Sequence, residues 1–159
     1  MVDVEHFLQE NNIAYKLHEH FAVFTVEEAR KYCGNIPGMH LKNLLLKGRK
    51  GNNFYLIILP GSHKTDLKML AEKLGEKKIS FASQENLMKK MKVDPGSVSV
   101  FGLLNNEEKD VQLFLGREVY ESDIVTFHPN RNTATLELDK GNFHKFLGIV
   151  ESNFKILDF

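Results

Sequence analysis

The stretch PGMHLKNLLLKGRKGNNFYLIILP, residues 37–60, decides the fold of this chain. Two apolar runs, at 44–46 and 54–60, flank the glycine- and asparagine-rich segment KGRKGNN. This pattern predicts a β-hairpin with a solvated connection. The first strand opens with Lys42 and Asn43, so a cation and an amide stand at the entrance of a buried strand. They are either solvated residues at a strand end or polar groups directed into a pocket.

Apolar periodicity and capping residues predict helices on both sides of the hairpin. Thr25, with Glu28 three residues later, forms a capping-box pattern that predicts a helix from Val26 to near Gly34. The clearest periodicity lies at 64–78, where Gly75 is the expected stop. Further helices are predicted at 3–11, capped by Asp3, at 83–92, capped by Ser83 with Leu87, Met88 and Met91 inward, and at 140–151.

Short strands are predicted at 14–20, 79–83, 111–115, 125–127 and 133–138. The polar hairpin turns between them favour antiparallel pairing over repeated βαβ crossovers. We therefore expect an α+β protein with a mixed, mainly antiparallel, curved and barrel-like sheet surrounded by helices. At 159 residues, the whole chain, 1–159, has the size of a single ordinary domain.

Composition places the chain among globular proteins and excludes several classes. Hydrophobic residues make up 42% and charged residues 26% of the sequence, and no apolar run approaches the roughly 20 residues of a membrane span. The formal net charge of +0 provides no long-range field that attracts nucleic acid. The start, MVDVEHFLQENNIAY, lacks the basic and apolar regions of a signal peptide. We expect a cytoplasmic protein that binds neither DNA nor membrane.

Common catalytic and metal-binding motifs are missing from the sequence, including GxxxxGK[ST], HExxH, GxSxG and GxGxxG after a strand. Cys33 is the single cysteine, so there is no disulfide framework. His18 and His20 would share one strand face, but no further ligand at suitable spacing completes a metal site. We therefore expect neither a metal nor another cofactor.

Two further segments place polar groups within apolar sequence. In PGSVSVFG, residues 95–102, Gly96 and Gly102 bracket small residues, so a ligand could approach the backbone N–H groups closely. The plainer interpretation is a β-turn followed by a buried strand. In FHPNRNTAT, residues 127–135, His128 and two asparagines share a tight turn, although asparagine, proline and threonine are common turn formers.

Six motifs follow one another along the chain: VFTVEEA (23–29), GMHLKNLLLK (38–47), TDLKMLAEKLG (65–75), PGSVSVFGLLNN (95–106), FHPNRNTATLEL (127–138) and ILDF (156–159). As an ordered set they resemble the YbaK/ProX family of aminoacyl-tRNA deacylases, the free-standing relatives of the editing domain of bacterial prolyl-tRNA synthetases. The likeness is strongest to the ProX-type subgroup, which removes alanine from proline tRNA. Val100 is one departure, because it stands where the family's GxxxP loop has a proline that fixes φ.

The resemblance implies the YbaK and prolyl-tRNA synthetase editing-domain fold, and an enzyme that hydrolyses an aminoacyl ester by positioning, water and oxyanion stabilisation. It implies Lys42, Asn43 and His128 as catalytic residues. Lys42 suits an electrostatic clamp on the ester, ribose or phosphate, and His128 suits orienting water or the terminal adenosine. Asn43 is the weaker half of its pair, because adjacent strand residues point to opposite faces. The implied substrate-binding residues are Val23, Phe24, Thr25, Gly96, Ser97, Val98, Ser99, Val100 and Gly102.

The implied substrate is alanyl-tRNA(Pro), bound through the acceptor end of the mischarged tRNA. Cysteinyl-tRNA(Pro) is an alternative because cysteine is close to alanine in size, and a non-catalytic module that binds an aminoacyl ligand or a partner is another. RNA contacts would come from KGRK (47–50), KKMK (89–92) and Arg131, unless these are ordinary solvated faces. Few phosphate contacts imply weak tRNA binding, so delivery by prolyl-tRNA synthetase or an elongation factor is considered.

Overall fold

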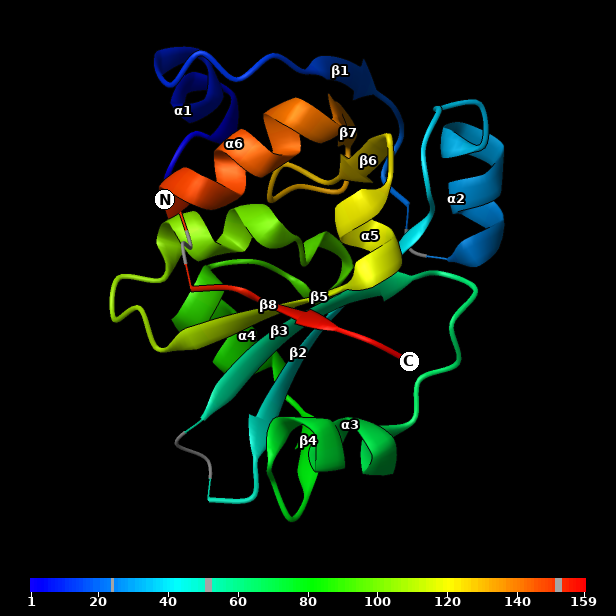
Figure 1. The fold of residues 1–159 in the computed structure, drawn as a ribbon. Coiled ribbons are helices and arrows are strands. Elements are labelled where there is room, and N and C mark those ends of the chain that lie inside the picture. Colours follow the sequence, from blue (N-terminus) through cyan, green and yellow to red (C-terminus); the bar gives the residue numbers. More distant parts are fainter. Residues whose placement is uncertain (24, 51–52, 151–152) are drawn as a thin grey trace.

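The fold is α+β, as predicted, with its strands divided between two sheets. The structure, a computed structural model, describes residues 1–23, 25–50, 53–150 and 153–159. Five strands pair in the order β4-β2-β3-β5-β8 and three in the order β1-β7-β6. Figure 1 shows the three-stranded sheet and α6 on one side of the five-stranded sheet and α3 on the other. Neither sheet closes into a barrel within the described residues. The strands are β1 Lys16–Glu19, β2 Leu41–Gly48, β3 Phe54–Pro60, β4 Ile79–Phe81, β5 Val111–Gly116, β6 Ile124–Phe127, β7 Ala134–Asp139 and β8 Lys155–Leu157.

The predicted hairpin is confirmed by the antiparallel pairing of β2 with β3, which runs from Leu41 opposite Pro60 to Lys47 opposite Phe54. Two residues of its predicted connection, at 51–52, lie outside the described residues. All residues of β3 are buried, because this strand lies in the middle of the sheet and both sheet faces are covered. Lys42 and Asn43 therefore belong to a paired strand rather than to its solvated end.

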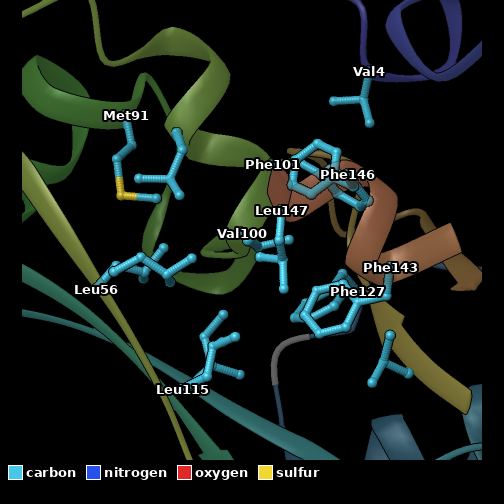
Figure 2. Packing of buried hydrophobic residues seen from close by; sticks show 14 of the residues in the cluster. Val4, Leu56, Met91, Val100, Phe101, Leu115, Phe127, Phe143, Phe146 and Leu147 are labelled. Atoms are coloured by element: carbon cyan, nitrogen blue, oxygen red, sulfur yellow. The ribbon is translucent and has the colours of Figure 1, made fainter. Parts of the chain in front are cut away.

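The two faces of the five-stranded sheet pack into two separate apolar clusters. Leu44 and Leu46 of β2 face the smaller cluster, which lies under α3 (Leu67–Leu74). Leu41 and Leu45 face the larger cluster, which includes residues of α6 (Lys140–Val150) and of the three-stranded sheet. In this larger cluster the rings of Phe101 and Phe146 lie edge to face with their centroids 5.1 Å apart (Figure 2). Each fully buried side chain of this size stabilises the fold by about 1.5–3 kcal/mol.

Most helix ends follow the capping residues that the sequence predicts, and Asp66 is an additional cap that was not predicted. Asp3, Thr25, Asp66 and Ser83 each accept a hydrogen bond from the backbone N–H three residues later, and Gly75 ends α3 with φ 74°. Glycine adopts a left-handed φ of this kind without the steric cost of a Cβ, which favours the end of α3 at this residue. The remaining helices are α1 Val4–Glu10, α2 Val26–Cys33, α4 Gln84–Met91 and α5 Arg117–Glu121.

One inward position of α4 was predicted wrongly. Met88 is 49% exposed, whereas Lys90 is buried beside Leu87 and Met91. Positions 87, 90 and 91 share the i, i+3, i+4 stripe, and Met88 lies to one side of it. Lys90 tolerates burial because its ammonium bonds the Asp110 carboxylate at 2.5 Å and lies 5.0 Å from the centroid of the Phe54 ring.

A buried strand was expected after the DPG turn, and this prediction is wrong. The turn is present, since the N–H of Ser97 donates to Asp94 O at 2.9 Å, but two 3₁₀ helices follow, η1 Pro95–Ser97 and η2 Val100–Asn105. Ser99 caps the second by accepting from the N–H of Phe101. Asn105 then donates to Met91 O at 2.9 Å, which fixes the end of η2 against the end of α4.

One further helix and one further strand were not predicted. The strand completes the mixed sheet. The short helix α5 follows β5 directly, and β8 pairs parallel with β5 through Ile156 opposite Leu115. The β3–β5 pair is parallel as well, so the predicted mainly antiparallel arrangement includes two parallel pairs. Met39 forms a single parallel bridge with Val125, which brings the start of β2 beside β6 of the other sheet.

Candidate functional site

A cavity of about 760 Å³ lies where the start of β2 meets the end of β6. Its walls come from parts of the chain that are distant in sequence. They include the start of β2 with Lys42 and Asn43, the β6–β7 region with Thr126, His128 and Thr135, helix α2 with Arg30 and Cys33 and the nearby Val23, and the segment of Gly96 and Val98. This volume suits a small ligand rather than a polymer, since ligand pockets typically span about 300–1,000 Å³.

Asn43 presents a buried acceptor without a partner at this cavity. Its Oδ1 atom is shielded from solvent and makes no hydrogen bond to any described residue. Strand alternation places Asn43 on the sheet face of Leu41 and Leu45, the face on which β6 and β7 pack. A buried carbonyl oxygen that lacks a donor costs about 1–3 kcal/mol. A bound ligand with an N–H or O–H group would remove that cost, so Asn43 is better placed than the sequence suggested.

Lys42 lies on the opposite sheet face, with Leu44 and Leu46, yet it also lines the cavity. Both neighbours reach the cavity because β2 has barely begun at Leu41 and the cavity surrounds the strand end. The Lys42 ammonium donates to the backbone carbonyl of His63. This bond satisfies one of the three ammonium donors and leaves two for a ligand.

His128 lines the cavity directly after β6, in the position expected from the sequence. Its Nδ1 lies 2.8 Å from Ala134 O, and because a carbonyl oxygen only accepts, Nδ1 carries the proton. Nε2 then presents a lone pair, and it has no partner among the described residues. Burial lowers the pKa of His128 from its ordinary value, and nearby His20 and His40 act in the same direction. The imidazole is therefore neutral at pH 7.

The asparagines of the β6–β7 turn hold the cavity walls together. Asn132 donates to Val23 O at 3.2 Å, and Asn130, in a left-handed conformation, donates to Phe101 O at 3.3 Å. The turn is thus bonded both to the segment before α2 and to η2. The sequence indicated a turn here, and these two bonds show why amides occupy it.

The predicted substrate-binding segment 95–102 divides into two parts. Gly96 and Val98 line the cavity, and their N–H groups donate to no described residue. The other predicted residues do not line it: Ser97, Ser99, Val100 and Gly102 are buried in the fold. Packing is tight at Gly102, because a Cβ there would lie 2.2 Å from Met91 Cε and 3.1 Å from Met91 Cβ. A Cβ at Gly96 would have its nearest neighbour, Asn132 Nδ2, at 3.7 Å.

The three predicted residues at 23–25 also differ in position. Val23 is buried and lines the cavity. Thr25 is exposed, does not line the cavity, and caps α2 by accepting from the N–H of Glu28 at 3.1 Å. Phe24 lies outside the described residues.

Several cavity residues were not predicted, above all Cys33, Arg30, Thr126 and Thr135. Burial raises the pKa of the Cys33 thiol, with an opposing effect from its hydrogen bond to Thr135. A protonated thiol is a poor nucleophile, which argues against covalent catalysis by Cys33. These residues come from α2 and from strands β6 and β7, and no local sequence signal distinguishes them from ordinary helix and strand residues.

The described ranges hold neither a metal-binding cluster nor a membrane-spanning helix. No set of three histidine, cysteine or acidic side chains is grouped closely enough to hold a metal ion in residues 1–23, 25–50, 53–150 and 153–159. In the same ranges no helix is long and apolar enough to cross a membrane.

The geometry supports hydrolysis without a protein nucleophile. A lysine ammonium and two backbone N–H groups can stabilise negative charge on a carbonyl oxygen. A neutral imidazole can accept a proton from water, and the Asn43 carbonyl can accept from an ammonium or a hydroxyl group.

Comparison with known proteins adds a family to this geometry. Residues 20–146 match the model of a family described as the aminoacyl-tRNA editing domain. The prolyl-tRNA editing protein ProX of Acetoanaerobium sticklandii is 36% identical over 151 residues, which cover 95% of this chain and 92% of that protein. The prolyl-tRNA synthetase associated domain-containing protein 1 of Xenopus laevis is 34% identical over 145 residues, 89% of this chain and 86% of that protein. A candidate trans-editing enzyme for prolyl-tRNA synthetase has a solved structure with a TM-score of 0.73 at 19% identity, over 98% of this chain and 93% of that one.

Proposed function

The chain belongs to the aminoacyl-tRNA editing domain family, and from this membership we propose that it hydrolyses the ester of mischarged proline tRNA, with alanine as the amino acid removed. Asn43 lines the cavity and has a buried Oδ1 atom without a partner, and this is the observation that carries the proposal. An aminoacyl ester offers this acceptor either its α-ammonium group or the free hydroxyl of the terminal ribose. A relative named for prolyl-tRNA editing supports proline tRNA as the carrier.

The proposed reaction needs a water, a charge stabiliser and a positioned ester. Lys42 stabilises the negative charge that develops on the ester carbonyl oxygen, together with the N–H group of Val98. His128 Nε2 accepts a proton from the attacking water, and the departing ribose oxygen takes up a proton as the ester C–O bond breaks. Ser97 and Ser99 are buried in the fold and Cys33 is held as a thiol, so water is the nucleophile.

Alanine is proposed because its side chain is small. Val23 and the Gly96 backbone line the cavity, and they are the proposed walls that exclude the proline ring. The proline ring has to be excluded sterically. Apolar contacts alone discriminate between two substrates that differ in one methylene group with a free energy of only about 1–3 kcal/mol. Val100 lies in the buried core and does not line the cavity. The absence of the family proline at this position therefore affects the packing behind the Gly96 segment and not the residues that a ligand would contact.

The proposed partner is the acceptor end of a mischarged tRNA in the cytoplasm. With a formal net charge of +0, the chain attracts tRNA only through local basic groups. Arg30 at the cavity is one of these groups. Weak intrinsic binding fits delivery of the tRNA by prolyl-tRNA synthetase or by an elongation factor. Co-purification of the chain with prolyl-tRNA synthetase, compared with and without tRNA, tests this part of the proposal.

A deacylation panel tests the function. Alanyl-tRNA(Pro), cysteinyl-tRNA(Pro) and prolyl-tRNA(Pro) are each incubated with the protein, and loss of the labelled amino acid is followed against the spontaneous rate. The proposal predicts rapid loss of alanine and retention of proline. Faster loss of cysteine than of alanine would identify cysteinyl-tRNA(Pro), rather than alanyl-tRNA(Pro), as the substrate. Rates equal to the spontaneous rate for all three would contradict an enzyme and favour a binding module.

A further inference from the structure

An exposed ring, Phe21, and a half-buried ring, Tyr32, contact each other close in sequence to residues that line the cavity. Phe21 is 74% exposed, and its ring centroid lies 5.3 Å from that of Tyr32 at an interplanar angle of 61°. Val23, two residues after Phe21, and Cys33, directly after Tyr32, both line the cavity. An exposed phenylalanine in water is unfavourable, so a pair of rings beside a ligand cavity indicates a surface that is covered when the ligand binds.

The backbone at Phe21 is held in place rather than free. His20 Nδ1 donates to Phe21 O at 2.8 Å, and His20 Nε2 lies 2.9 Å from Thr135 Oγ1, a cavity residue. The N–H of His20 also donates to Thr133 O at 3.0 Å. Phe21 is therefore attached to β7, while Tyr32 is supplied by α2, which stands at the edge of the molecule in Figure 1. A backbone that is already held in place loses little further conformational entropy when the residue binds a partner.

Basic groups accompany the two rings. The Lys31 ammonium lies 5.3 Å from the centroid of the Tyr32 ring, and Arg30, its neighbour on α2, lines the cavity. The acidic residues of α2, Glu27 and Glu28, lie in the first turn, at the other end of the helix. The end of α2 that carries Tyr32 is therefore the cationic end, which suits a phosphate next to a stacked base.

We propose that Phe21 and Tyr32 form the stacking platform for the terminal nucleobase of the tRNA acceptor end. The inference rests on the proposed function, because an aminoacyl ester in the cavity is bonded to the terminal ribose and so places its base at the cavity rim. Proteins bind unpaired bases by stacking them on exposed aromatic rings, and a cation beside the rings contacts the phosphate. Stacking of this kind is independent of the tRNA identity, because every mature tRNA ends in the same bases.

Substitution of the ring tests the platform. Phe21→Ala is expected to raise the KM for alanyl-tRNA(Pro) about tenfold, the loss expected for one stacked base. Phe21→Trp, which keeps a flat ring, should restore the KM. Phe81→Ala is the matched control, since Phe81 is a 54% exposed phenylalanine on β4 that does not line the cavity. Thermal unfolding of each variant checks that the fold is kept.

Two substrates separate this inference from the proposed function. Alanine ethyl ester has the same ester but no nucleotide, so Phe21→Ala should impair hydrolysis of alanyl-tRNA(Pro) far more than hydrolysis of the ethyl ester. Equal impairment of both would overturn the platform, and so would an unchanged KM for the tRNA. Binding of a fluorescent oligonucleotide ending in CCA gives a readout without catalysis. Weaker binding by Phe21→Ala than by Phe81→Ala supports the platform even if the wild-type protein hydrolyses no ester, and equal binding overturns it.

Discussion

The β2 wall of the cavity and the 95–105 segment opposite it use polar residues in contrasting ways. In β2, regular pairing with β3 holds Lys42 and Asn43 at the cavity with donors and an acceptor to spare. In the 95–105 segment, the side chains of Ser99 and Asn105 bond neighbouring backbone, so they stabilise the fold. In these two walls, polar residues within apolar sequence belong to the candidate binding site only where some of their hydrogen-bonding groups remain unpaired.

Removal of the β2 cation should have the largest effect. Lys42→Ala is expected to lower kcat/KM for alanyl-tRNA(Pro) by about 100-fold or more, because the developing oxyanion loses its charged stabiliser. Lys68→Ala, an exposed lysine of α3, is the matched control and should leave kcat/KM unchanged. Single-turnover deacylation measures both variants. A folded Lys42→Ala variant with wild-type activity would remove Lys42 from the site.

The two glycines of the 95–105 segment should respond in opposite ways. Gly102→Ala is expected to lower the free energy of unfolding by about 1–3 kcal/mol, because its Cβ would overlap the buried side chain of Met91. Gly96→Ala, whose Cβ would meet its nearest neighbours at ordinary contact distance, should change that free energy by less than about 0.5 kcal/mol but lower kcat/KM by narrowing the cavity. Urea unfolding and deacylation rates separate the two. Equal losses of stability would contradict the division of this segment.

Asn43→Ala should improve stability while impairing activity. Removal of a buried acceptor that has no partner is expected to raise the free energy of unfolding by up to about 1 kcal/mol. The rate of deacylation should fall about tenfold, since one hydrogen bond to the ester end is lost. Urea unfolding with and without a bound alanyl ester analogue measures the first effect. A less stable variant with an unchanged rate would show that Asn43 serves the fold alone.

The smallest effect concerns the pH dependence of stability through His128. Its pKa in the folded protein is below the ordinary value of about 6.5, so the unfolded chain binds the proton more readily. Stability from this group is therefore present above about pH 6.5 and is lost as the pH falls through the lowered pKa. His128→Asn keeps a donor for Ala134 O and should lose less stability between pH 7.5 and pH 5.5. Identical losses in urea unfolding would contradict a buried neutral imidazole.

Much of the fold could be predicted because the signals were local. Apolar runs around the KGRKGNN segment predict the hairpin, and Thr25 and Gly75 predict helix ends through their own backbone bonds. The 3₁₀ helices could not be predicted in this way, since Asn105 stabilises them by a bond to Met91, 14 residues away in sequence. The parallel strand β8 likewise depends on β5, which lies far from it along the chain.

The candidate site was predicted only in part for the same reason. Strand alternation correctly placed Lys42 and Asn43 on opposite faces of the sheet. It could not show which of these two residues lies on the side of β6. Cys33 and Thr135 reach the cavity through the packing of α2 against β7, and their local sequence gives no sign of it. Resemblance to a family indicated the whole 95–102 segment, whereas packing determines that only Gly96 and Val98 of the predicted residues there line the cavity.

Binding of the aminoacyl end in this cavity is tested most directly by titration with an alanyl-adenosine analogue in which an amide replaces the ester. The analogue is not hydrolysed, and ¹H–¹⁵N NMR follows the Asn43 side-chain amide and the Val98 backbone amide. Both signals should shift and saturate, while Lys109 and Val111, which line a separate cavity of about 370 Å³, should not. Shifts confined to Lys109 and Val111, or no shifts at saturating analogue, would contradict a deacylation site between β2 and β6.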